Sequence, residues 1–134
     1  MTNILMMIAT VVVLWILFAF GGWLWIFLSA KQNGKLLKPE DFASKIDSDN
    51  GQIIDVRESE PYKRSHIMGA RNISAMNFLQ GKSGLRQDRD IFLYDDNLRD
   101  VVRVARSLKK QGYAKEKIFI LRGGFSRYEG KKTK

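Results

Sequence analysis

An almost unbroken apolar run near the start constrains this chain more than any other feature. Residues 4–28 read ILMMIATVVVLWILFAFGGWLWIFL and contain no charged side chain. At ~1.5 Å per helical residue, such a run reaches across a hydrocarbon core of ~30 Å. Only segments that satisfy their own backbone hydrogen bonds cross lipid, so the run predicts one transmembrane α-helix within residues 1–30.

Two other interpretations of the run stay open. A cleaved signal peptide has a basic start and an apolar stretch of only about 7–15 residues, and this run has neither property. The sequence Leu28-Ser29-Ala30 nevertheless resembles a short cleavage site. A buried core helix is the second alternative.

The charges that flank the run predict its orientation. No Asp, Glu, Lys, Arg or His precedes Lys31, so the formal net charge of +9 belongs entirely to residues 31–134. Lys31, Lys35 and Lys38 follow the run before any acidic residue. The positive-inside rule therefore places the N-terminus outside the cell membrane and the rest of the chain in the cytoplasm. A basic domain held there is expected to attract anionic lipid headgroups.

Two further features bear on partners. Gly21-Gly22 would let two membrane helices approach closely, but the pair lacks the four-residue spacing of packing motifs and indicates a homodimer only weakly.

The helix expected after Asn97 exposes a basic face that would also suit nucleic acid. This face lacks interleaved aromatic residues, so a lipid surface is the first expectation and an unidentified protein partner the second. Its basic residues are Arg99, Arg103, Arg106, Lys109 and Lys110.

The remaining chain is long enough for one compact domain. We expect a polar linker at residues 31–37, the domain at 38–130 and a frayed basic tail at 131–134. Within the domain, short β-branched runs alternate with helical patterns, which predicts an α/β fold with a small parallel sheet flanked by helices. The expected strands are QIIDV, ARNIS, DIFLY and KIFIL, and the expected helices begin at Pro39, Ser59, Ala75, after Asn97, and at Gly123.

Two stretches of the domain resemble the signatures of rhodanese-like domains. IIDVRESEPYKRSHIMGARNIS resembles the opening signature of that family, and GYAKEKIFILRGGFSRY resembles its closing signature. The resemblance covers roughly residues 36–128 and implies the rhodanese fold. Active members carry a cysteine directly after the central strand, in a loop whose backbone N–H groups hold an anion. That cysteine takes a sulfane sulfur from a donor such as thiosulfate and passes it on.

The resemblance also shows where this chain departs from the family. Matching Tyr94 and Gly112-Tyr113 to the family places Asp95 at the cysteine position, in the loop Asp95-Asp96-Asn97-Leu98-Arg99-Asp100. The family's usual glycine is Leu98, and its closing arginine falls on Asp100, with Arg99 one place early. The chain contains no cysteine. Persulfide chemistry requires a thiolate, and several carboxylates in one loop repel anions.

These points predict a membrane-anchored, catalytically inactive rhodanese-like domain that serves as a binding or regulatory module without a cofactor. A thiosulfate-type sulfurtransferase is the alternative, and a basic domain that binds nucleic acid is a third. The candidate binding residues are the loop residues Asp95, Asp96, Asn97, Leu98, Arg99 and Asp100, together with Arg57. We further hypothesise that the Asp95 carboxylate accepts the loop N–H groups that would otherwise hold an anion.

Specific chemical roles for single residues, such as a nucleophile or a metal ligand, are weaker hypotheses. An aspartyl nucleophile normally occurs as Asp-x-Asp, a spacing that Asp95-Asp96 lacks. A divalent cation could bind Asp95, Asp96 and Asn97, but three adjacent residues rarely point at one ion. His66 and Asp55 are expected to be structural, and Gly123-Gly124 to form a tight turn after a strand.

Overall fold

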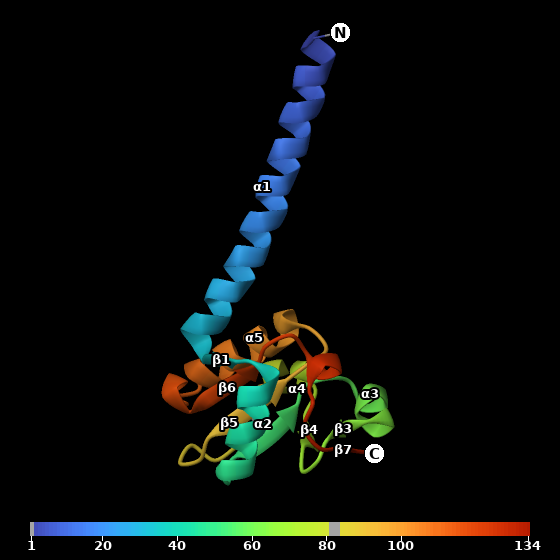
Figure 1. The fold of residues 1–134 in the computed structure, drawn as a ribbon. Coiled ribbons are helices and arrows are strands. Elements are labelled where there is room, and N and C mark those ends of the chain that lie inside the picture. The colour runs from blue at the N-terminus through green and yellow to red at the C-terminus, as the bar shows by residue number, and fades with distance from the viewer. Residues whose placement is uncertain (1, 81–83) are drawn as a thin grey trace.

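The computed structural model describes residues 2–80 and 84–134, apart from the side chains of residues 29–33, among them Lys31. A single long helix, α1 (Thr2–Asn33), stands on an α/β domain (Figure 1). Residues Thr2–Leu28 of this helix are long and apolar enough to cross a membrane, and none of them is buried by the domain. A core helix of a soluble protein would be covered, so the uncovered helix does not match that alternative.

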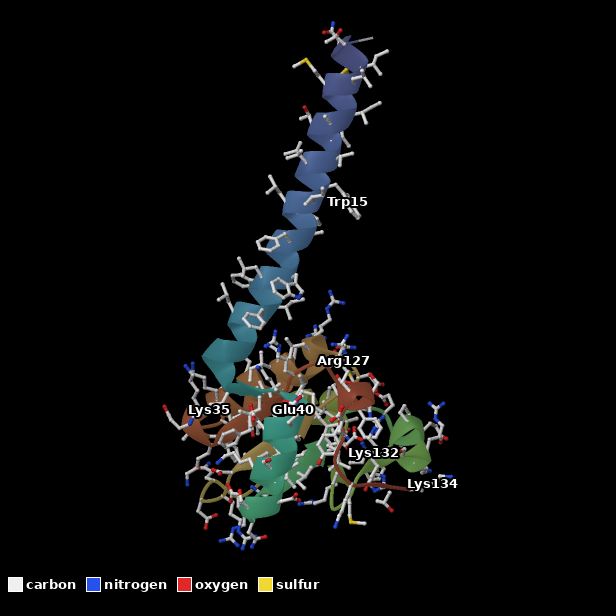
Figure 2. The ribbon with its side chains drawn as sticks, viewed as in Figure 1. Trp15, Lys35, Glu40, Arg127, Lys132 and Lys134 are labelled. Atoms are coloured by element: carbon white, nitrogen blue, oxygen red, sulfur yellow. The ribbon has the colours of Figure 1, made fainter. Side chains whose placement is uncertain are left out.

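Figure 2 shows that α1 and the α/β domain carry different kinds of side chain. The side chains along the upper part of α1, around Trp15, are almost entirely carbon. Nitrogen-bearing side chains such as Lys35, Arg127 and Lys134 gather on the domain below. Apart from Lys31 near the end of α1, the excess positive charge therefore lies on the domain.

The domain is built on a parallel sheet of five strands, as the alternation of strands and helices predicts. The strand order is β1-β6-β5-β2-β4, and every neighbouring pair is parallel. The central strand, β5, is buried along its whole length. The strands are β1 (Lys35–Leu37), β2 (Gln52–Asp55), β4 (Arg71–Asn72), β5 (Ile91–Tyr94) and β6 (Ile118–Leu121).

Helices cover both faces of this sheet, because successive side chains of a strand point to opposite faces. Ile91 and Leu93 of β5 pack into a core formed with α4 and α5, whereas Phe92 and Tyr94 pack into a second core with Phe42 of α2. The helices are α2 (Pro39–Ser48), α3 (Ser59–Arg64), α4 (Ala75–Gln80) and α5 (Leu98–Lys110).

The expected linker and tail are both wrong, because each contains a strand. Part of residues 31–37 forms β1, whose Leu36 pairs with Ile120 of β6 and packs against the core. Part of the tail forms β7 (Lys132–Thr133), which pairs antiparallel with β3 (His66–Ile67). Both strands are too short to show a period in the sequence, and their conformation depends on a partner that is distant along the chain.

Two short 3-10 helices replace parts of expected elements. The helix expected from Gly123 is only the single turn η2 (Phe125–Arg127), and the turn η1 (Lys115–Lys117) occupies the expected first residue of β6. Gly123 and Gly124 both have positive φ, 87° and 83°, so the chain turns sharply after β6 and does not continue into a longer helix.

Candidate functional site

The central strand leads directly to Asp95, which the resemblance places at the family's cysteine position. β5 ends at the fully buried Tyr94, whose hydroxyl oxygen accepts the backbone N–H of Ile67 at 3.0 Å. Asp95 follows at the carboxyl end of the sheet, which is where sites of parallel α/β domains form. The buried strand therefore fixes the place of Asp95 at the start of the loop.

Asp95 is almost completely enclosed, with a side chain only 5% exposed. Its Oδ1 accepts the backbone N–H of Asp96 at 2.6 Å, while its Oδ2 has no hydrogen-bond partner among the described residues. Burial raises the pKa of Asp95 to about 6, and the neighbouring carboxylates of Asp100 and Asp96 add to this rise. The hypothesis that converging N–H groups satisfy this carboxylate is therefore wrong for one of its two oxygens.

The turn after β6 packs directly on the same loop. The N–H of Phe125 donates to the backbone oxygen of Asp95 at 2.8 Å. A Cβ atom on Gly124 would collide with the backbone oxygen of Asp96, so only glycine fits there. The tight turn that the sequence predicts is present, and the structure adds that it holds the site loop in place.

Arg57 forms the second charged component of the site. It is 7% exposed, and its Nη2 donates to Oδ2 of the fully buried Asp55 at 2.7 Å and to the backbone oxygen of Ser65 at 2.6 Å. Its Nη1 lies 3.5 Å from Oδ1 of Asp96, and its guanidinium lies 4.2 Å from the centre of the Phe125 ring. Burial lowers the pKa of Arg57, but the hydrogen bonds and charge of Asp55 outweigh this and raise it above its ordinary value. Arg57 is thus a fixed cation whose charge is already balanced by Asp55.

The loop, Arg57 and α4 enclose a pocket of about 300 Å³. Of the seven predicted binding residues, the pocket is lined by Arg57, Asp95, Asp96, Asn97 and Asp100.

The other two predicted residues point elsewhere. Leu98 packs against the core beneath α5, and Arg99 lines a different cleft beside α1. Asn97 also caps α5, since its Oδ1 accepts the N–H of Arg99 at 2.9 Å. The turn of the helix that starts here therefore separates the loop residues into two groups.

Several pocket residues were not predicted from the sequence. Arg103 follows Asp100 at the i+3 spacing of a helix face, which is a signal that could have identified it. The wall from α4 has no comparable signal, because that helix is only six residues long. The residues in this group are Val56, Glu58, Pro61, Ala75, Met76, Leu79 and Arg103.

The charge balance of the pocket is unfavourable for an anion. Four carboxylates, those of Glu58, Asp95, Asp96 and Asp100, face two guanidinium groups, and one of these is engaged by Asp55. Among the described residues, no group of three or more His, Cys, Asp or Glu side chains is arranged to hold a metal ion.

His66 does not line the pocket: its ring stacks on Tyr62 at 3.8 Å, and its Nδ1 lies 2.8 Å from the backbone oxygen of Tyr62. This histidine is structural, as expected.

Comparison with known proteins gives consistent results for this domain. The family model of the rhodanese-like domain matches residues 38–131. The protein YqhL of Bacillus subtilis is 37% identical over 97 residues, which are 72% of this chain and 74% of that protein. A tRNA sulfurtransferase of Desulfurococcus amylolyticus is 36% identical over 89 residues, which are 65% of this chain but only 17% of that enzyme. A rhodanese-like domain from Anabaena superposes with a TM-score of 0.64 at 23% identity, covering 73% of this chain and 77% of that domain.

Proposed function

The chain belongs to the rhodanese-like family, and from this membership we propose that it is a membrane-anchored member without sulfur-transfer activity, serving as a binding or regulatory module. The observation that carries the proposal is the place of Asp95. It directly follows the central strand and lines the pocket at the carboxyl edge of the sheet, in a chain that has no cysteine.

The chemistry of sulfur transfer explains why this residue matters. In the reaction, a thiolate attacks the outer sulfur of thiosulfate, forms a persulfide and releases sulfite. A carboxylate oxygen is not a nucleophile that stores sulfur in this way, and the 134 residues contain no thiol. The three further carboxylates that line the pocket would also repel thiosulfate.

The name of one relative supports the competing enzyme. The Desulfurococcus protein is named a tRNA sulfurtransferase, but this chain matches only 17% of its length. The activity of that whole enzyme therefore transfers to this chain only as the alternative to be tested.

The membrane anchor is the second part of the proposal. It is supported by the uncovered apolar helix α1 and by the absence of charged side chains before Lys31. In this arrangement the helix crosses the cell membrane once, and the domain lies at its cytoplasmic surface, where a protein partner would reach the Asp95 pocket.

A sulfur-transfer assay on the full chain in detergent micelles tests the loss of activity. Thiosulfate and cyanide are supplied, and thiocyanate is measured for the wild type, Asp95→Asn and Asp95→Cys. Asp96→Cys is the matched control, because it places a thiol one residue further along on a side chain that is 60% exposed. We expect the wild type and Asp95→Asn to match the protein-free background. Thiocyanate formed by the wild type and abolished by Asp95→Asn would overturn the proposal.

A further inference from the structure

The foot of α1 and the side of α5 enclose a cleft that the proposed function does not use. The two helices lie side by side where α1 meets the domain (Figure 1). The cleft has a volume of about 350 Å³. Gly22, Trp25 and Ile26 line it from α1, and Arg99, Arg103 and Arg106 line it from α5.

The three arginines share one face of α5, because they are spaced by four and three residues. All three are exposed, whereas the opposite face of α5 is buried in the core. Their guanidinium groups have no hydrogen bond or ion pair with any described residue, unlike that of Arg57. Three cations held close together, none of them in an ion pair with a described residue, favour an anionic ligand.

The depth of the cleft relative to a membrane follows from the length of the apolar helix. The 27 residues from Thr2 to Leu28 extend about 40 Å at ~1.5 Å per residue, which exceeds a ~30 Å hydrocarbon core. Because a basic, polar domain follows the helix, we expect the end nearest the domain to lie among the lipid headgroups. Trp25 is at this level, where tryptophan is common in membrane proteins.

A second contact holds this end of the helix against the domain. The guanidinium of Arg122, directly after β6, lies 5.5 Å from the centre of the Phe27 ring. Arg127, in the turn that follows, lies at the upper edge of the domain, the edge from which α1 rises (Figure 2). The surface that faces the headgroups is therefore basic beyond the cleft itself.

We propose that the cleft between α1 and α5 binds the phosphate-bearing headgroup of an anionic phospholipid of the cytoplasmic leaflet. Arginine guanidinium groups bind phosphate through paired hydrogen bonds, which suits the unpaired Arg99, Arg103 and Arg106. Trp25, Ile26 and Val102 provide apolar contacts for the glycerol and upper acyl region of the same lipid. The inference rests on the membrane anchor of the proposed function.

Occupancy of this cleft would affect the pocket beside it. Arg103 lines both the cleft and the Asp95 pocket, so the two sites share one wall. A phosphate that engages Arg103 fixes the position of its guanidinium at the edge of the pocket. The lipid would thereby couple membrane composition to the shape of the pocket.

The test uses the full chain in nanodiscs of phosphatidylcholine alone or mixed with phosphatidylglycerol. After mild release, native mass spectrometry measures which lipids stay bound. The variant R99Q/R103Q/R106Q removes the proposed ligands. The matched control R64Q/R71Q/K131Q removes the same charge from exposed residues of α3, β4 and the C-terminal segment, away from α1 (Figure 1). Circular dichroism verifies that each variant is folded.

We expect the wild type and the control to retain phosphatidylglycerol over phosphatidylcholine by about tenfold, and the cleft variant to lose this preference. A wild type that retains both lipids equally would overturn the inference. So would a control that loses the preference as completely as the cleft variant, because general charge would then explain it. Displacement of the lipid by an equal concentration of soluble glycerol phosphate would overturn the lipid as the source of the phosphate. Failure of the wild type to enter nanodiscs would instead contradict the membrane anchor itself.

A second readout reports on the cleft directly. In the variant W15F/W23F, Trp25 is the only tryptophan left. Brominated phosphatidylglycerol should quench its fluorescence more strongly than brominated phosphatidylcholine at the same mole fraction. Equal quenching by the two lipids would contradict the inference.

Discussion

The Asp95 carboxylate is buried with one oxygen unpaired, and this has a consequence for stability at the scale of the single residue. Its pKa is about 6 in the folded protein and about 3.9 in an unfolded chain. Below about pH 4 the carboxyl group is protonated in both states and does not lower the stability of the fold. As the pH rises from about 4 to 6, the unfolded state loses the proton first, so the stability of the fold decreases by up to about 3 kcal/mol.

Asp95→Asn removes this ionisation while keeping an oxygen that accepts the N–H of Asp96. We therefore expect the variant to gain stability relative to the wild type as the pH rises from 4 to 7.5, by up to about 3 kcal/mol. Thermal unfolding of the full chain in neutral detergent, followed by near-ultraviolet circular dichroism at each pH, measures the difference. Glu60→Gln on exposed α3 is the control. A difference between Asp95→Asn and the wild type that does not change with pH would show that Asp95 titrates normally.

At the scale of elements, the sheet and its helices could be predicted from local patterns. The β-branched runs of β2, β5 and β6 and the amphipathic spacing of α5 carry their own signal. β1 and β7 carry none, because strands of three and two residues depend on distant partners. The position of Asp95 was predictable because it follows a recognisable buried strand. The direction of Arg99 and the unpaired Oδ2 of Asp95 were not, because they depend on how α1, α5 and the loop pack in three dimensions.

The turn between β6 and η2 provides a test of how elements position the loop. Gly124 has φ 83° and ψ 172°, a region that is essentially restricted to glycine, and a Cβ there would strike the backbone of the site loop. Gly84→Ala is the matched control: Gly84 has φ 72°, but no atom of the described residues lies within 4 Å of a Cβ at that position.

We expect Gly124→Ala to lower the free energy of unfolding by more than about 3 kcal/mol, because steric overlap adds to backbone strain. Gly84→Ala should cost only the strain, about 1–2 kcal/mol. Denaturant unfolding of the two variants in parallel gives both values. Equal losses would mean that the turn does not press on the Asp95 loop.

At the scale of the whole molecule, we propose that the N-terminus and the domain lie on opposite sides of the cell membrane. The absence of cysteine makes this simple to test, because each introduced thiol is unique. In intact cells, a membrane-impermeant maleimide should label Asn3→Cys but not Lys134→Cys, and permeabilisation should expose both. Labelling of Lys134→Cys in intact cells would reverse the orientation derived from the flanking lysines.

The whole molecule also shows why the two proposed sites belong together. The Asp95 pocket and the cleft beside α1 lie on either side of α5 and share Arg103. In the proposed arrangement, a lipid bound in the cleft would act on the Asp95 pocket through the shared Arg103.

Under the proposed function Asp95 cannot take up a sulfur atom, and the mass of the intact chain tests this. The wild type and Asp95→Cys are incubated with thiosulfate, desalted without reductant and weighed by mass spectrometry. We expect the mass of the wild type to stay unchanged, whether or not the variant gains the mass of a sulfur atom. A wild-type chain heavier by one sulfur atom, with the addition removed by dithiothreitol, would contradict it.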